Sequence, residues 1–128
     1  MRVLLDSHVL LWWATGGAQI SPSARGLIED PTNDALVSAG SLYEIATKAR
    51  IGRLDLPGDA ETYLPQLVRR FGFGILPVHE HHALRAAGLP VIHRDPWDRL
   101  LVGQAQVEGI PIITADPQIG QYDVRVVW

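Results

Sequence analysis

Cysteine is absent from the 128 residues of this chain. Its absence excludes disulfide bonds and thiolate metal sites, and it is compatible with a reducing cytoplasm. Long apolar runs are missing too, because no stretch approaches the roughly 20 residues that a membrane-spanning helix needs. The first apolar run is interrupted by Asp6 and His8, which favours a strand over a signal peptide. We therefore expect a cytoplasmic protein that does not bind membranes.

Lysine occurs once, as Lys48, and the formal net charge of the chain is -3. Domains that bind nucleic acids are often basic, so this balance by itself argues against such a ligand. Bound divalent cations, however, would reverse the sign of the charge at an acidic site. The basic residues also gather locally, at 48–53 and at 69–70. These two segments fit either solvated helix faces or contacts to phosphate groups.

Short apolar runs alternate along the chain with longer amphipathic segments. Hydrophobic residues make up 47% of the composition and charged residues 20%, which is typical of a globular domain. We expect strands at 3–5, 35–38, 75–78, 112–113 and 124–127, and helices at 7–14, 22–29, 41–50, 60–71, 80–87 and 95–107. Strands that alternate with helices pair in parallel through right-handed crossovers. The sequence thus predicts a single domain over residues 1–128, a three-layer α/β/α sandwich with about five parallel strands.

Four acidic residues lie at corresponding places in this pattern: Asp6, Glu44, Asp98 and Asp116. Asp6 and Asp116 come just after strands, and Glu44 and Asp98 lie in the first turns of helices. Parallel sheets build their ligand sites at the carboxyl ends of the strands, so the four carboxylates can converge there. Magnesium and manganese ions prefer such oxygen ligands. Cations held in this way activate water and stabilise the charge on a phosphate group, which favours nuclease chemistry.

Each of these acids also has a structural explanation. Asp95–Pro96 is typical of a helix N-cap followed by proline, and Asp98 then lies where an acid favours the helix dipole. Asp116 precedes another proline, Asp6 is a candidate cap of the next helix, and Glu44 is a candidate exposed helix residue. The case for a site therefore depends on all four acids sharing one edge of the sheet.

Four segments together resemble the PIN domain, and within it the VapC-type toxins of bacterial toxin–antitoxin pairs. They are LLDSHVLLW at 4–12, SLYEIA at 41–46 with Lys48 and GRL at 52–54, HRDPWDRLL at 93–101, and ITAD at 113–116. The resemblance covers essentially the whole chain. It implies a magnesium-dependent endoribonuclease, with manganese as an alternative cation. Its catalytic acids would be Asp6, Glu44, Asp98 and Asp116, and its metal ligands Asp6, Asp98 and Asp116.

At two positions of this implied site the sequence offers alternatives: the third acid, and the hydroxyl or amide residue near the fourth. Asp95 competes with Asp98 for the third acidic position, because it lies one helical turn away. We prefer Asp98, since the corresponding family acid precedes an apolar helical run, here residues 100–102. Family members often have a hydroxyl or amide residue near the fourth acid, and Thr114 is either this residue or an ordinary strand residue. Asp116 is followed by Pro117 where many members have an aromatic residue.

The resemblance also implies partners: an RNA substrate, a second copy of the chain in a homodimer, and a VapB-like antitoxin whose tail lies across a groove of the toxin. Leu11, Trp12 and Trp13 lie close to Asp6 in the sequence and would form an apolar wall for that tail. Core packing is the alternative for at least one tryptophan, because adjacent residues of a helix point in different directions.

The remaining candidates are histidines and arginines. His79, His81 and His82 surround a glutamate without the His-Glu-x-x-His spacing of zinc proteases, so we expect no metal there. We expect His8 and His93 to be polar packing residues and not general bases. Arg94 and Arg99 are candidate phosphate contacts, unless they pair with the neighbouring acids.

The same residues decide between this function and four others. A receiver domain needs a lysine late in the chain, and the single lysine here is Lys48. A haloacid-dehalogenase-type phosphatase needs Asp-x-Asp after the first strand, where this chain has Asp6, Ser7 and His8. A PIN-type nuclease of RNA processing and a non-catalytic interaction module remain as alternatives. A module would bind its partner equally well after Asp6→Asn, whereas a nuclease would lose activity. The small size and the absence of further domains favour the toxin.

Overall fold

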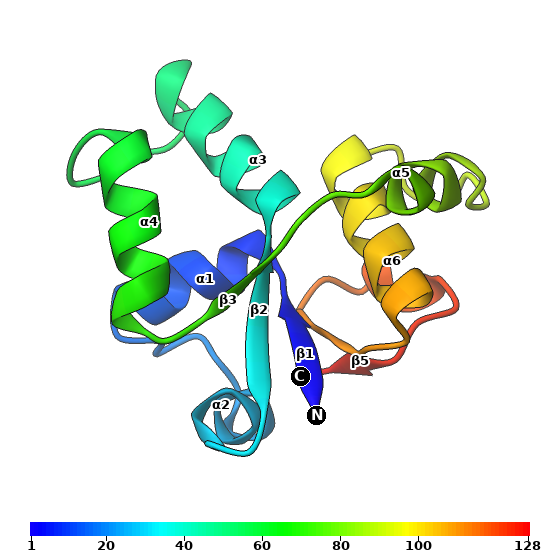
Figure 1. Cartoon of the computed structure of the whole chain (residues 1–128), viewed down its shortest axis with the longest axis horizontal. Coiled ribbons are helices and arrows are strands. Elements are labelled where there is room, and N and C mark those ends of the chain that lie inside the picture. The colour runs from blue at the N-terminus through cyan, green and yellow to red at the C-terminus, as the bar shows by residue number, and fades with distance from the viewer.

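Five parallel strands form the central sheet of the protein in a computed structural model that describes all residues from 1 to 128 (Figure 1). The strands lie in the order β3–β2–β1–β4–β5, and all four pairings are parallel. Their bounds are β1 Arg2–Leu5, β2 Asp34–Ser38, β3 Gly74–Leu76, β4 Ile112–Ile113 and β5 Val126–Val127. β1 therefore lies in the middle, with β2 on one side and β4 on the other.

Helices cover both faces of the sheet (Figure 1). One face carries α1 Ser7–Ala14, α2 Pro22–Glu29, α3 Ala39–Arg50 and α4 Ala60–Arg70, and the other carries α5 Glu80–Ala87 and α6 Pro96–Glu108. The predicted three-layer α/β/α sandwich with five parallel strands is thus confirmed. None of the helices combines the length and apolar character that crossing a bilayer requires.

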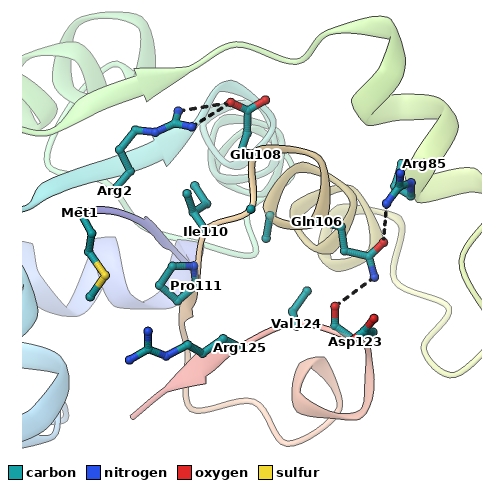
Figure 2. A pocket seen from close by; sticks show the side chains of 12 residues that line it. Met1, Arg2, Arg85, Gln106, Glu108, Ile110, Pro111, Asp123, Val124 and Arg125 are labelled. Carbon is teal, nitrogen blue, oxygen red and sulfur yellow. Dashed lines mark hydrogen bonds and ion pairs between the residues drawn. The ribbon is translucent and has the colours of Figure 1, made fainter.

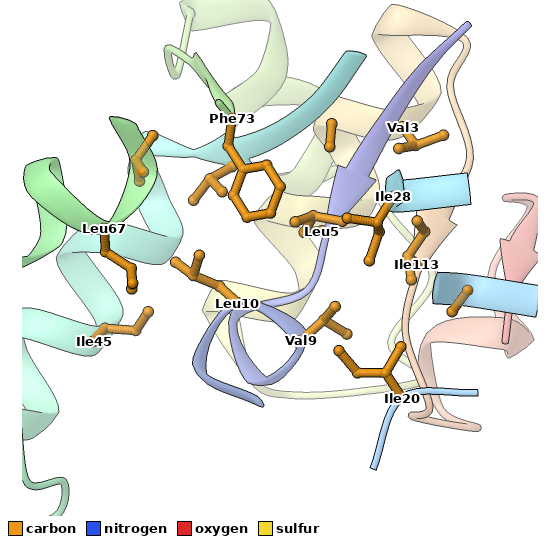
Figure 3. Packing of buried hydrophobic residues seen from close by; sticks show 14 of the residues in the cluster. Val3, Leu5, Val9, Leu10, Ile20, Ile28, Ile45, Leu67, Phe73 and Ile113 are labelled. Atoms are coloured by element: carbon orange, nitrogen blue, oxygen red, sulfur yellow. The ribbon is translucent and has the colours of Figure 1, made fainter. Parts of the chain in front are cut away.

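Alternation along β1 divides the apolar residues between two cores. Val3 and Leu5 pack with α1 to α4, whereas Leu4 packs with α6 and the end of the chain. Successive residues of a strand point to opposite faces, so each core receives every second side chain. Figure 3 shows Leu5 facing Val9 and Leu10 of α1 in the first core. Burial on both faces explains why the central strands are almost wholly apolar.

The element boundaries differ from the prediction by two residues at three places and by one residue at others. α3 begins at Ala39 and not at residue 41, because the Ser38 hydroxyl accepts a hydrogen bond from the backbone N–H of Gly40 and caps the helix two residues earlier. β3 covers only Gly74–Leu76, and β5 begins at Val126 and not at residue 124. The backbone N–H of Val124 bonds to the carbonyl of Tyr122, which keeps that residue in a turn.

The close contact between α5 and α6 yields a testable prediction. A Cβ atom on Gly103 of α6 would lie 2.8 Å from the backbone nitrogen of Ala86 and 2.9 Å from the carbonyl oxygen of His82. We expect Gly103→Ala to lower the free energy of unfolding by about 1–3 kcal/mol, because backbone atoms must move.

Gly26→Ala in α2 is the matched control. No atom lies within 4 Å of the Cβ position there, so the better helix propensity of alanine is expected to stabilise the protein by about 0.5–1 kcal/mol. Urea denaturation of both variants measures the difference. Equal stabilities would show that the two helices are not packed as closely as described.

Candidate metal centre

The site lies at the point where the chain changes direction across the sheet. After β1 the chain adds β2 and β3 on one side, and it then returns through α5 and α6 to add β4 on the other. Open α/β sheets bind ligands outside the carboxyl ends of the strands at such a switch point. Leu5 of β1 is in register with Ile113 of β4. The next residues, Asp6 and Thr114, therefore lie side by side, and the Thr114 hydroxyl donates a 2.7 Å hydrogen bond to Oδ2 of Asp6.

Asp6 is 4% exposed and fully engaged in hydrogen bonds. Its Oδ1 accepts from the backbone N–H of His8 at 3.2 Å and from the hydroxyl of Ser7 at 3.3 Å, so Asp6 also caps α1. Burial alone would raise the pKa of this carboxyl, but the contacts with His8 and Thr114 outweigh burial and hold the pKa below its usual value. The carboxylate therefore stays ionised, and the capping role does not compete with a place in the site.

Asp98 lies in the first turn of α6, one turn after Asp95. Oδ1 of Asp95 accepts from the backbone N–H groups of Trp97 at 2.9 Å and of Asp98 at 3.3 Å, so Asp95 is the helix cap. The side chain of Asp98 faces His93 instead, whose Nε2 lies 2.7 Å from Oδ2. Burial raises the pKa of Asp98 to about 6, and the negative charges of Asp95 and Asp6 contribute to the rise.

Asp116 joins this group from the end of β4. Its backbone N–H donates to the Thr114 hydroxyl at 3.0 Å, and its Oδ1 accepts from the backbone N–H of Gln118 at 2.9 Å. Ligand atoms of His93, Asp98 and Asp116 all lie within 4.8 Å of one another. The structure thus brings Asp98 and Asp116 together from segments that are distant in the sequence. Thr114 is part of the site, because its hydroxyl connects Asp6 with Asp116.

Glu44 lies on α3 and forms an ion pair with Lys48. Its side chain is 6% exposed, and Oε2 lies 2.6 Å from Nζ of Lys48 one helical turn later. The suggestion that Glu44 is an exposed helix residue is therefore wrong. Together with His8 and Arg53, these two side chains line a cleft of about 280 Å³ between α1 and α3. Glu44 is outside the group of His93, Asp98 and Asp116, and it borders the site from the cleft side.

The two histidines next to the acids differ from the packing role predicted for them. His8 is exposed, and its Nδ1 lies 3.7 Å from Oδ1 of Asp6. This contact raises the pKa of His8. His93 is partly buried and bonded to Asp98, so it belongs to the candidate site. No spacing rule indicates His93, because it precedes α6 in a loop whose course depends on the packing of α5. A hydrogen bond between Tyr122 and the backbone of His93 also fixes that loop.

The donor set fits a hard divalent cation. Asp6, Asp98 and Asp116 offer carboxylate oxygens, and one imidazole lies among them. Burial is the main cause of the raised pKa of Asp98, and the negative charges of Asp95 and Asp6 add to it. Oxygen-rich groups of this kind suit magnesium and manganese ions.

Several other candidates have structural roles. The Arg99 guanidinium donates to the carbonyls of Pro90 at 2.8 Å and of Ala86 and Leu89 at 3.0 Å, so it holds the end of α5. Arg94 is exposed beside Trp97 in a second surface pocket.

His82 likewise connects two helices. Its Nδ1 accepts from the backbone N–H of His79 at 3.0 Å, so Nε2 carries the proton and donates to Glu108 at 2.8 Å. Glu108 in turn pairs with Arg2 at 3.2 Å. Both ring nitrogens of His82 are occupied by these bonds, which leaves neither lone pair free for a metal although His81 and Glu108 are close.

A cavity of about 640 Å³ lies at the opposite end of the sheet from the four predicted acids. Figure 2 shows it between the starts of β1, β4 and β5, with Arg2 bonded to Glu108 and Arg85 bonded to Gln106. Arg2 and Arg85 thus already have partners, and the carboxylates of Glu108 and Asp123 line the cavity.

The two tryptophans of α1 separate as predicted for adjacent helix residues. Trp13 packs against Phe71 and Phe73, with ring centroids 6.4 and 6.3 Å away, so the core alternative holds for Trp13. Trp12 also packs at the edge of this core, and its ring contacts those of His8 and Trp128, with centroids 5.9 Å away in each case.

Comparison with known proteins identifies the family. The family model of the PIN domain matches residues 3–125. This chain belongs to the PIN domain family. Among its relatives is "Ribonuclease VapC22" of Mycobacterium tuberculosis, which is 34% identical over 119 residues that make up 91% of this chain and 88% of that protein. Membership of the PIN family excludes the receiver domain and the phosphatase as alternatives.

Solved structures share the PIN fold at low sequence identity. VapBC2 from Rickettsia felis bound to a DNA fragment from its promoter superposes with a TM-score of 0.72 at 13% identity, covering 99% of this chain and 98% of that one. A toxin–antitoxin complex from Klebsiella pneumoniae superposes with a TM-score of 0.67 at 16% identity, covering 98% and 96%. At these identities the likeness shows the fold alone.

The crowded carboxylates yield a prediction about stability without metal. The pKa of Asp98 is raised from 3.8 to about 6 in the folded protein, so folding binds a proton between these values and stability falls as the pH rises through them. In EDTA at pH 7, Asp98→Asn should therefore raise the free energy of unfolding by about 1–3 kcal/mol.

Thermal unfolding across pH 3.5 to 7.5 measures this difference. We expect the gain to shrink below pH 6 and to disappear near pH 4, where the wild-type carboxyl is also protonated. Asp55→Asn, at an exposed loop position, is the control and should leave the unfolding temperature unchanged. A destabilising effect of Asp98→Asn at pH 7 would contradict the crowding of like charges.

Proposed function

We propose that this PIN-domain protein is a magnesium-dependent endoribonuclease, with manganese as an alternative cation, and that it acts as the toxin of a toxin–antitoxin pair. The observation that carries the proposal is the convergence of Asp6, Asp98 and Asp116 at the switch point of the sheet. The 34% identity to "Ribonuclease VapC22" over most of both chains supports it. A single domain over residues 1–128 contains every residue that the proposal needs.

The proposed division of labour follows from the contacts. Asp6, Asp98 and Asp116 would hold the cation. When bound, the cation activates water and stabilises the negative charge that develops on the phosphate group. Thr114 orients Asp6 by its 2.7 Å hydrogen bond, and His93 orients Asp98 by its 2.7 Å bond. Such bonds to ligand side chains fix their direction before a metal arrives.

Glu44 completes the catalytic acids from the cleft side. Its carboxylate is buried and bonded to Lys48, so it faces the substrate path with its charge largely balanced. RNA that enters the cleft would meet His8, Lys48 and Arg53 along the wall next to the acids. These side chains can contact phosphate groups without reading the base sequence. The acidic net charge of the chain therefore does not oppose an RNA substrate at this place.

A non-catalytic interaction module explains these features less well. Burial and neighbouring charges raise the pKa of Asp98 to about 6, which means that the folded protein retains a costly ionised carboxyl at neutral pH. Carboxyl groups with a strongly raised pKa are typical of functional sites and have no benefit in a module that does not use a cation. The nearest alternative is a PIN nuclease of RNA processing, which would cut RNA by the same residues without arresting growth.

Cleavage of single-stranded RNA by the purified protein tests the activity. We expect magnesium-dependent cleavage by the wild type, loss of cleavage in EDTA, and a decrease of at least about 100-fold for Asp98→Asn, because a direct electrostatic contribution is removed. Asp95→Ser is the matched control, since serine can also cap α6 and the variant should retain cleavage. Cleavage that persists in EDTA and in Asp98→Asn would sink the mechanism.

Growth after induction of the same variants separates the toxin from an RNA-processing nuclease. Wild type and Asp95→Ser should arrest growth in the cytoplasm where we propose that the protein acts, and Asp98→Asn should not. Co-expression of the cognate VapB-like antitoxin should restore growth. Cleavage in vitro without growth arrest would support the RNA-processing alternative.

We also propose that the protein forms a homodimer. Tyr43 is 63% exposed and contacts Trp97, with ring centroids 5.1 Å apart, so two large aromatic rings lie at the surface beside α3 and α6. Val91 and Leu84 are 80% and 72% exposed. Apolar side chains of this size at a surface are typical of protein interfaces. Trp12 beside the cleft is the candidate contact for an antitoxin tail.

Sedimentation equilibrium measures the oligomeric state directly. We expect a mass of twice the 14.1 kDa of one chain, and we expect Tyr43→Lys to shift the equilibrium toward the monomer by placing a charge in the interface. Ile51→Lys, at another exposed apolar position of similar exposure, is the control and should leave the mass unchanged. A wild-type mass of one chain at micromolar concentration would contradict the dimer.

A further inference from the structure

Lys48 has a position that the proposed metal site does not yet explain. It is the single lysine of the chain, and it lies on α3 one turn after Glu44. Its Nζ is 2.6 Å from Oε2 of Glu44. Ion pairs of this spacing on a helix surface usually connect two exposed side chains and contribute little. Here the carboxylate is 6% exposed, whereas the lysine side chain is 37% exposed and reaches the cleft.

The ammonium group of Lys48 interacts with the charges of Glu44, Asp95 and Asp98. The hydrogen bond with Glu44 raises the pKa of Lys48, and the charges of Asp95 and Asp98 raise it further. Lys48 is thus charged at neutral pH, and its charge lies within the field of Asp95 and Asp98. Arg99 of α6 does not share this task, because its guanidinium is bound to carbonyls at the end of α5.

Nucleases that use two cations hold them roughly 3.5–4 Å apart, with carboxylates shared between them. In this chain the acids divide into two groups. Asp98 and Asp116 gather with His93, and Asp6 joins them through Thr114. Glu44, the remaining acid, already holds a positive charge at hydrogen-bond distance. A second divalent cation at Glu44 would have to displace this ammonium and would be repelled by it.

We propose that Lys48 takes the place of a second divalent cation, so that the site binds one metal ion and the ammonium supplies the second positive charge next to the RNA phosphate. The inference rests on the proposed ribonuclease function. In this proposal Nζ of Lys48 has two roles. It neutralises the buried carboxylate of Glu44 in the free protein, and it faces the RNA from the wall of the cleft.

Counting bound manganese ions without RNA tests this inference. Equilibrium dialysis should give about one ion per chain for the wild type. Lys48→Gln removes the charge and can still donate a hydrogen bond to Glu44, so the protein should fold and should bind a second ion. Lys48→Arg keeps the charge and should bind one. The double variant Glu44→Gln/Lys48→Gln lacks both charges and should also bind one, because the second ion needs the carboxylate of Glu44.

Two manganese ions bound to the wild type would overturn the inference, so the wild-type measurement alone is a test. One ion bound to folded Lys48→Gln, as judged by circular dichroism, would overturn it as well. Cleavage supplies a second readout: Lys48→Gln should lose about 100-fold in rate at low manganese concentration and should recover at high concentration. Lack of recovery would count against the replacement of a cation by Lys48.

The same measurements distinguish this inference from the function on which it rests. Two ions in the wild type together with cleavage that EDTA abolishes would remove the role of Lys48 and leave the ribonuclease intact. One ion in the wild type together with cleavage that EDTA does not affect would remove the proposed mechanism and with it the task of Lys48. One ion, EDTA-sensitive cleavage and a second ion in Lys48→Gln would support both.

Discussion

The pairing of β1 with β4 is the constraint on which the rest of the site depends. It joins residues more than a hundred positions apart and sets Thr114 beside Asp6, where a 2.7 Å hydrogen bond connects them. Through the same hydroxyl Thr114 orients Asp116. The long return of the chain through α5 and α6 then sets Asp98 at the edge that these strands form. A change that shifted this register by one residue would turn Asp6 and Thr114 to different faces of the sheet.

Like charges at this edge oppose folding, and the structure balances them only in part. Asp6 has hydrogen bonds that keep it ionised, and Glu44 has the ammonium of Lys48. Asp98 has His93, but burial and the neighbouring acids still raise its pKa to about 6. The unbalanced part of the charge is what a divalent cation would neutralise. The proposed metal site thus lowers the stability of the protein locally, as is common where function requires it.

Much of this arrangement could be predicted from the sequence, because it follows from rules of position. Asp6 and Asp116 come at the ends of strands, and parallel strands present their ends at one edge, so their convergence needed no knowledge of the loops. The Asp95–Pro96 pair likewise identified Asp95 as the N-cap of α6. The three-layer sandwich followed from the alternation of strands and helices.

The rest depends on contacts between segments whose relative position the sequence pattern does not encode. His93 reaches Asp98 because Tyr122 holds the preceding loop, and Arg99 turns away from the site because the end of α5 lies beside it. The boundaries of β3 and β5 were predicted poorly, since edge strands pair on one side only and end where turns begin.

Anomalous scattering from a crystal grown with manganese tests the central claim most directly. The account predicts one peak per chain, roughly 2.0–2.2 Å from carboxylate oxygens of Asp6, Asp98 and Asp116, with Nζ of Lys48 still bonded to Glu44. A peak elsewhere, such as between His81 and Glu108, or no peak among these three acids, would contradict it.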